Sequence, residues 1–187
     1  MALVPYRDPD SLPEEQRRIV RRPIHLYRAL ANEPEGTQSF YDFAEWVRWH
    51  CPLDARLREM LILYIGYLSR DPYEWSHHIV LGREFGVTDD DVSALIDHAE
   101  RRESTLTDKE KLVLDATEQL TVDAYLDDMT WSALTTMFDD RELTDIVMVA
   151  SFYCMVVRVL GGLRIDVEPE YQAALDRFPL PTREMTH

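Results

Sequence analysis

The segment "SRDPYEWSHHIVLGREFG", residues 69–86, concentrates proton-carrying side chains among aromatic and aliphatic residues. In a helix that turns about 100° per residue, Asp71, Glu74 and His78 lie on one narrow stripe, whereas His77 points about 100° away from His78. A glutamate and a histidine four residues apart can form a hydrogen bond that raises the histidine pKa and fixes its tautomer. Glu74 and His78 are therefore a candidate proton-transfer pair.

The same residues are also typical of the start of a helix, which is a structural alternative to a catalytic role. Asp71 suits the N-cap, the proline after it suits the first helical position, and Glu74 completes a capping box. Capping explains Asp71 and Glu74, but it does not explain His78. Nor does it explain Glu59, which lies in an otherwise almost entirely apolar helix and needs a partner once buried. Arg58 points about 100° away from Glu59 and is not assumed to be that partner.

The elements that must position these side chains are helices, because apolar residues recur mostly three and four positions apart and no strand pattern is found. We predict helices at about residues 13–20, 23–31, 37–50, 55–69, 72–85, 88–100, 107–122, 131–138 and 141–160, and a short helix in the tail. "NEPEG" is expected to separate the second and third of these helices, and Gly161-Gly162 to end the long one. We therefore predict an all-α fold, a compact multi-helix bundle.

The chain of 187 residues is long enough for one domain, and no linker divides it. We expect a single domain over residues 1–187, with a core at about 23–165 and extensions at both ends. The formal net charge of -15 argues against binding to nucleic acid or to an anionic membrane surface. No signal-peptide core and no apolar stretch of membrane-spanning length is recognised. A soluble, cytoplasmic protein is expected.

The sequence offers little for a metal or a cofactor. Glu74-Trp75-Ser76-His77 has the Glu-x-x-His spacing of di-iron helix bundles, but such sites need a second motif and two more glutamates. The second copy is Glu184–His187, near the end of the chain and after prolines. His77 and His78 as a zinc pair would lack a third ligand. Gly-rich phosphate loops and haem motifs are absent, so we expect no metal and no cofactor.

The segment "LREMLILYIGYLSRDPYEWSHHIVLGREFGVTDDDVSALI", residues 57–96, resembles the carboxymuconolactone decarboxylase family, which includes the alkylhydroperoxidase D proteins. The resemblance extends more loosely to "PIHLYRALANEPE", "LTDKEKLVLDATEQL" and "DRELTDIVMVASFY", and so covers most of the chain. It implies an all-helical, alkylhydroperoxidase D-like fold that assembles as a homo-oligomer, either a trimer or a hexamer.

The peroxidase branch of this family carries a glutamate, then Cys-x-x-Cys, then a histidine four residues later. On this chain the glutamate matches Glu59 and the histidine matches His78, but Asp71 and Glu74 occupy the two cysteine positions. The two cysteines of the chain lie elsewhere, with no metal or redox spacing, and are expected to be buried free thiols. Thiol peroxidase activity is therefore not expected. The "YEWSHH" form resembles the decarboxylase-type branch, which uses acid–base chemistry without a cofactor.

The resemblance implies a lyase that removes CO2 from a small carboxylated lactone or a related anionic molecule. Loss of CO2 leaves an enolate-like anion that must be stabilised and then protonated on carbon. His78 is the expected proton donor, since an ordinary histidine pKa of about 6.5 suits proton transfer near neutrality. Glu74 and Glu59 are expected to orient it or to relay the proton. An isomerase that uses the same groups, and a non-catalytic helical oligomer that binds a small molecule or a partner, remain open.

Five further residues are candidates for contact with the substrate. Asp71 and His77 flank the proton-transfer pair, and Trp75 and Tyr153 are aromatic residues that could form a wall. Arg158 lies within the apolar run "FYCMVVRVLGG" and is the candidate cation for a substrate carboxylate. The expected partner is thus a small, anionic molecule.

Overall fold

The computed structural model describes residues 1–182, apart from the side chains of Glu15 and Ile19, and contains no strand in that part of the chain. The α-helices are α1 (His25–Leu30), α2 (Pro34–Trp49), α3 (Ala55–Leu68), α4 (Pro72–Gly82), α5 (Asp89–Ala99), α6 (Asp108–Val122), α7 (Asp128–Leu134), α8 (Asp140–Leu163) and α9 (Gln172–Arg177). Short 3-10 helices are η1 (Pro9–Ser11), η2 (Glu14–Val20), η3 (Arg83–Phe85) and η4 (Pro169–Tyr171). The predicted all-α fold is confirmed.

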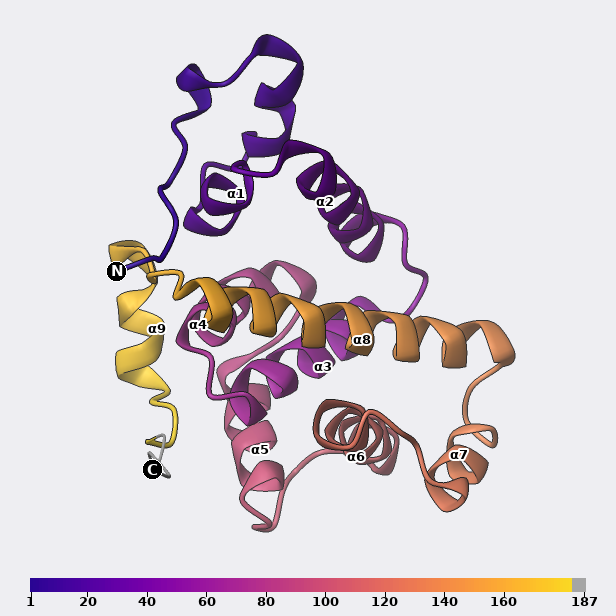
Figure 1. The fold of residues 1–187 in the computed structure, drawn as a ribbon. Helices are drawn as coiled ribbons and strands as arrows, with labels where there is room; N and C mark the ends of the chain where they lie inside the picture. The colour runs from indigo at the N-terminus through magenta and orange to yellow at the C-terminus, as the bar shows by residue number, and fades with distance from the viewer. Residues whose placement is uncertain (183–187) are drawn as a thin grey trace.

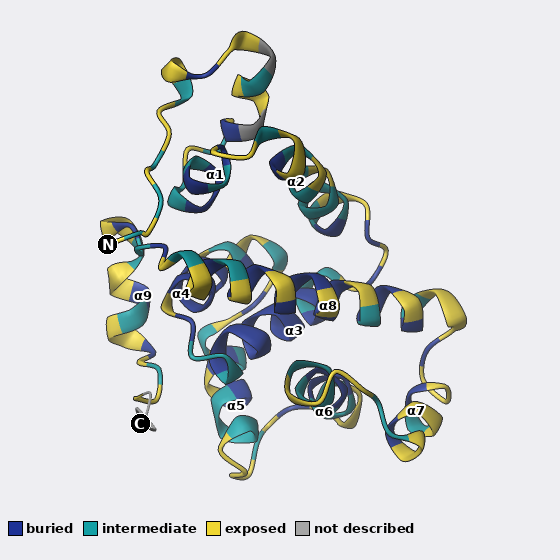
Figure 2. Ribbon diagram, viewed as in Figure 1, coloured by how far each residue is buried: buried dark blue, intermediate teal, exposed yellow. Residues whose placement is uncertain are grey.

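Helix α3 is the centre of the molecule, and α4, α5, α6 and α8 pack around it (Figure 1). Residues 60–65 of α3 have no exposed surface, which explains why its sequence is apolar on almost every face. Figure 2 shows α3 as the most completely buried helix of the bundle. Asp54 caps it by accepting a hydrogen bond from the Leu57 amide at 2.9 Å.

The turn from α3 to α4 brings the two helices close together. Arg70 adopts a left-handed conformation with φ of 50°, and the Asp71 amide donates to the carbonyl of Gly66 at 3.0 Å. A Cβ atom on Gly66 would lie only 3.1 Å from the backbone nitrogen of Trp75. The glycine therefore permits the backbone approach that sets α4 against α3.

Several helix boundaries differ from the prediction, among them those of α7, which spans Asp128–Leu134 and not residues 131–138. Helix α2 begins at Pro34, not near residue 37, because Glu33 acts as its N-cap and accepts from the Gly36 amide at 2.5 Å. Helix α8 continues through both glycines and ends at Leu163, where Arg164 takes the left-handed conformation of a C-terminal cap. Gly86, with φ of 93°, ends the η3 turn after α4, as predicted.

Within the described residues, one helix is long and apolar enough to cross a membrane by length and composition alone. It is α8, with 24 residues and a mean hydropathy of 2.0 over its most apolar window. The expectation that no stretch reaches this length was therefore wrong. Half of that window is buried inside the fold, where it packs against α3 and α6, as in the core helix of a soluble bundle.

The N-terminal segment meets the segment that follows α8 close to α4 (Figure 1). The Leu3 amide donates to the Leu163 carbonyl at 2.8 Å, and the His25 amide donates to Glu168 at 2.6 Å. Helix α9 packs against α4, and the Trp75 indole donates to the carbonyl of Phe178 at 2.7 Å. The segments at the two ends thus cover the helix that carries both histidines of the motif.

Candidate active site

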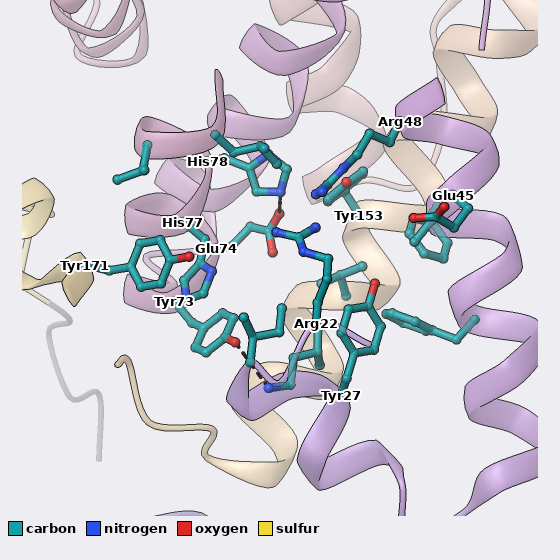
Figure 3. Close-up of a pocket in the computed structure, with 18 of the residues that line it drawn as sticks. Arg22, Tyr27, Glu45, Arg48, Tyr73, Glu74, His77, His78, Tyr153 and Tyr171 are labelled. Carbon is teal, nitrogen blue, oxygen red and sulfur yellow. Dashed lines mark hydrogen bonds and ion pairs between the residues drawn. The ribbon is translucent and has the colours of Figure 1, made fainter. Parts of the chain in front are cut away.

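A cavity of about 120 Å³ lies in front of α4 (Figure 3). Its walls come from residues 22–27, α2, α4, η3, α8 and η4, so segments near both ends of the chain contribute. The lining residues that could do chemistry are Arg22, Tyr27, Glu45, Arg48, Tyr73, Glu74, His77, His78, Glu84, Tyr153 and Tyr171. Aliphatic and phenyl groups fill the spaces between them, which is the composition of a small-molecule site.

His78 lies between two carboxylates. Its Nδ1 donates to Oε2 of Glu59 at 2.8 Å, and its Nε2 lies 3.0 Å from Oε1 of Glu74. All three side chains are at least nine-tenths buried. Behind Glu59, the guanidinium of Arg58 lies 3.2 Å from the other carboxylate oxygen. The expectation that Arg58 points away from Glu59 is corrected, because its long side chain turns back to reach the carboxylate.

This arrangement keeps His78 positively charged at neutral pH. Burial lowers the pKa of His78, but the charge of Glu74 and the hydrogen bond to Glu59 outweigh it and raise the pKa to about 9. Burial likewise raises the pKa of Glu59, and the hydrogen bond from His78 outweighs that effect and lowers it. The result is a proton held on a buried imidazolium at the wall of the cavity.

The carboxylate of Glu74 has fewer polar contacts than that of Glu59. Its Oε1 is buried and accepts no hydrogen bond, because the contact with His78 lies off the N–H direction and is an ion pair only. The backbone amide of Glu74 donates to Asp71 at 2.9 Å, so the N-cap interpretation of Asp71 is correct. Glu74 therefore lies in the first turn of α4 and also presents a carboxylate oxygen to the cavity wall.

His77 points to a different partner, as the helical geometry predicts. Its Nε2 donates to Oε2 of Glu168 at 2.8 Å, and its ring is stacked between Tyr73 at 4.0 Å and Tyr171 at 3.6 Å. Burial lowers the pKa of His77, so the ring is neutral at pH 7. Burial raises the pKa of Glu168, but the hydrogen bonds from His77 and from the His25 amide lower it to about 2. Adjacent histidines on α4 thus carry different charges.

Of the other residues predicted from the sequence, Tyr153 lines the cavity, with its ring edge-on to His78 at 5.2 Å. Asp71 and Trp75 do not line it, since Asp71 is an N-cap and Trp75 is fully buried against Tyr67. Arg158 is exposed on α8, donates to the carbonyl of Cys154 at 2.6 Å and lies outside the cavity. The structure therefore does not bring Arg158 to the site.

Two arginines that the sequence analysis missed line the cavity instead. Arg48 follows Phe40 and Ala44 at four-residue intervals on α2, and all three line the cavity. This stripe is visible in the sequence and could have identified Arg48. Arg22 precedes a proline in the segment between η2 and α1. This segment has no helical repeat from which the direction of the Arg22 side chain could be predicted.

Among residues 1–182, no three His, Cys, Asp or Glu side chains are grouped so as to hold a metal ion. Glu74 and His77 turn to different partners, and the Glu184–His187 motif lies outside the described residues. Cys51 and Cys154 are buried free thiols, as expected, and neither lines the cavity.

Comparison with known proteins relates the middle of the chain to a protein family. Residues 34–119, from α2 to α6, match the model of the carboxymuconolactone decarboxylase family. This stretch of the chain belongs to the carboxymuconolactone decarboxylase family. It contains Glu59, Glu74 and His78, whereas Arg22, Tyr153 and Glu168 lie outside it. No curated protein matches the sequence of the chain.

Solved structures share the fold over most of the chain. An uncharacterized peroxidase-related protein from Ralstonia eutropha JMP134 with an alkylhydroperoxidase AhpD core has a TM-score of 0.76 at 15% identity, over 91% of this chain and 94% of that one. An uncharacterized peroxidase-related protein from Silicibacter sp. TM1040 has a TM-score of 0.74 at 20% identity, over 90% and 91%. The debrominase Bmp8, in complex with 2,3,4-tribromopyrrole, has a TM-score of 0.71 at 13% identity, over 81% and 80%. The fold is alkylhydroperoxidase D-like.

Proposed function

We propose that the protein is a cofactor-free acid–base enzyme that decarboxylates a small carboxylated lactone or a related organic anion. The observation that carries this proposal is His78, a buried imidazolium held between Glu59 and Glu74 at the wall of a cavity. A proton donor with a high pKa stays loaded at neutral pH. The family match over residues 34–119 supports the same reaction class.

In the proposed reaction, the carbon–carbon bond to the substrate carboxylate breaks and CO2 leaves. The bonding electrons move into a conjugated carbonyl group and form an enolate-like anion. The Nε2–H of His78 then protonates carbon, and the neutral imidazole regains a proton from solvent. Glu59 holds the ring through Nδ1, and both carboxylates favour reprotonation.

A proton-shift isomerase is the second candidate. It is favoured by Glu74, whose Oε1 accepts no hydrogen bond and can act as a base beside the acid His78. A base and an acid on one wall are what a 1,3-proton shift requires. Thiol peroxidase chemistry is not proposed, because Asp71 and Glu74 replace the motif cysteines.

We further propose that the protein acts in the cytoplasm as a homo-oligomer, a trimer or a hexamer. Support for assembly comes from the surface of α8, where Met148 and Met155 are exposed beside the phenyl rings of Phe40 and Phe43. Sedimentation equilibrium measures the assembly directly. A monomer at micromolar concentration would contradict it.

Decarboxylation of γ-carboxymuconolactone by metal-stripped protein tests the reaction. His78→Gln keeps a polar side chain but removes the acid, so the rate should fall by about 10²-fold or more. His98→Gln is the matched control, because His98 pairs with Asp115 on the far side of α3 and does not line the cavity. An unchanged rate in His78→Gln would overturn the mechanism. If the folded wild-type protein gave no turnover, this substrate would be wrong and the isomerase would be tested next.

A further inference from the structure

Arg22 and Arg48 reach the cavity from opposite elements, Arg22 from the segment before α1 and Arg48 from the last turn of α2. Figure 3 shows both guanidinium groups directed into the space in front of His78 and Glu74. Both side chains are half-buried. Among residues 1–182, neither forms an ion pair or a hydrogen bond.

Several other arginines of the chain, in contrast, have carboxylate partners. Arg56 pairs with Asp91 and Glu110, Arg58 pairs with Glu59, and Arg101 pairs with Glu118. The formal net charge is -15, so carboxylates are abundant on this protein. Removing a guanidinium from water without a partner costs free energy. Two such groups at one cavity therefore indicate a site that is completed by an anionic ligand.

A third group on the cavity wall also lacks a hydrogen-bond partner. Oε1 of Glu74 is buried and accepts no hydrogen bond from the described part of the chain. A carboxylate oxygen can only accept, so an O–H or N–H donor of a ligand can supply the hydrogen bond that the ion pair with His78 leaves unmade. Within residues 1–182, the cavity wall thus carries two guanidinium groups without a partner and one buried carboxylate oxygen that accepts no hydrogen bond.

We propose that Arg22 and Arg48 bind the carboxylate of a small ring compound, and that the same ligand presents a hydroxyl or amino group to Glu74. This inference rests on the proposed function, because it names the substrate class of the same site. The carboxylate between the arginines anchors the ligand and is not the group lost as CO2. Loss of CO2 must move the negative charge of the departing carboxylate onto carbon, and two guanidinium groups would oppose this by stabilising the charge on the carboxylate.

The size of the cavity supports a ligand of one ring. The cavity volume is about 120 Å³, and a cavity of about 150 Å³ in another protein holds benzene. Arg22 lies outside the family segment at residues 34–119. The N-terminal segment of this chain would therefore contribute half of the recognition of the anion.

Equilibrium binding tests the proposal without any need for turnover, and thus separately from the proposed reaction. The probe is 4-hydroxybenzoate, measured by calorimetry beside benzoate, which lacks the hydroxyl, and 4-hydroxybenzyl alcohol, which lacks the charge. The wild-type protein should bind 4-hydroxybenzoate most tightly. Arg22→Gln and Arg48→Gln should each weaken it about tenfold or more, as expected for a hydrogen bond between charged groups.

Arg158→Gln is the matched control and should bind like the wild type, because Arg158 is exposed outside the cavity. Arg22→Lys and Arg48→Lys keep the charge and should lose less affinity than the glutamine variants. If a glutamine variant does not fold, the lysine variant at the same position still tests the role of the guanidinium. Circular dichroism verifies the fold of each protein. Equal affinity for the acid and the alcohol, no loss in the glutamine variants, or no binding of 4-hydroxybenzoate would each overturn the assignment.

Discussion

The Nδ1 atom of His78 lies 2.8 Å from Oε2 of Glu59, and this contact joins the two helices α4 and α3 at the centre of the fold. Both residues are buried, so the hydrogen bond depends on how closely the two helices approach. That approach in turn depends on the turn between them and on the absence of a side chain at Gly66. The chemistry of the site is therefore sensitive to changes at a distance from the cavity.

Gly66→Ala should push α3 and α4 apart. Its Cβ would lie 3.1 Å from the backbone nitrogen of Trp75 and 3.3 Å from its Cα, and backbone atoms cannot turn aside. We expect a loss of about 1–3 kcal/mol in the free energy of unfolding, measured by urea denaturation. Gly161→Ala is the control, because nothing lies within 4 Å of its added Cβ. It should be neutral or stabilising by up to about 1 kcal/mol. Equal effects at the two glycines would contradict this account.

Glu59→Gln should lower the pKa of His78, because the amide removes one of the two charges that hold the proton. The alkaline limb of the pH–rate profile should move to lower pH, and kcat should fall by about tenfold or more. KM should change little, since Glu59 does not line the cavity. Glu118→Gln is the control, because Glu118 pairs with Arg101 and Tyr64 away from the site. An unmoved alkaline limb would show that Glu59 does not set the charge of His78.

The stability of the fold should depend on pH through His78. The folded-state pKa of His78, about 9, lies above its ordinary value of 6.5. The stabilisation is therefore fully present below pH 6.5 and is lost as pH rises through about 9. We expect it to be on the order of 3 kcal/mol. Denaturation of the wild type and of His78→Gln at both ends of this range isolates the contribution. The same pH dependence in both proteins would contradict it.

Glu168→Ala should destabilise the protein by about 2–5 kcal/mol. The carboxylate of Glu168 accepts from the His25 amide, the Tyr73 hydroxyl and the His77 ring, and removing it leaves two buried donors and one partly buried donor without this acceptor. Glu170→Ala, two residues later and exposed, is the matched control and should be nearly neutral. Chemical denaturation compares the two. A difference of less than about 0.5 kcal/mol would argue against a structural role for the cluster.

The part of the site that lies on α4 could be predicted because helical geometry is local. The pairing of Glu74 with His78, the N-cap at Asp71 and the separate direction of His77 all follow from the helical repeat. The partnership of Glu59 with His78 came from the family resemblance, since the two residues lie on different helices. The all-α fold followed from apolar spacing alone.

The rest of the cavity depends on contacts between distant segments. Arg22 and Glu168 reach α4 from opposite ends of the chain, and no local pattern predicts that meeting. The apolar neighbours of Arg158 point to a partner in the site, but Arg158 lies five residues after Tyr153. Five residues correspond to a rotation of about 140°, so the two side chains leave α8 on different faces. Periodicity would have corrected this assignment.

His78 should be a charged proton donor at neutral pH, while its neighbour His77 should be neutral. Nitrogen NMR of protein labelled with ¹⁵N-histidine tests it most directly, with His78→Gln used to assign the signal among the six histidines. Both ring nitrogens of His78 should stay protonated through neutral pH, and the ring should titrate with a pKa of about 9. A His78 ring that is already neutral at pH 7 would contradict it.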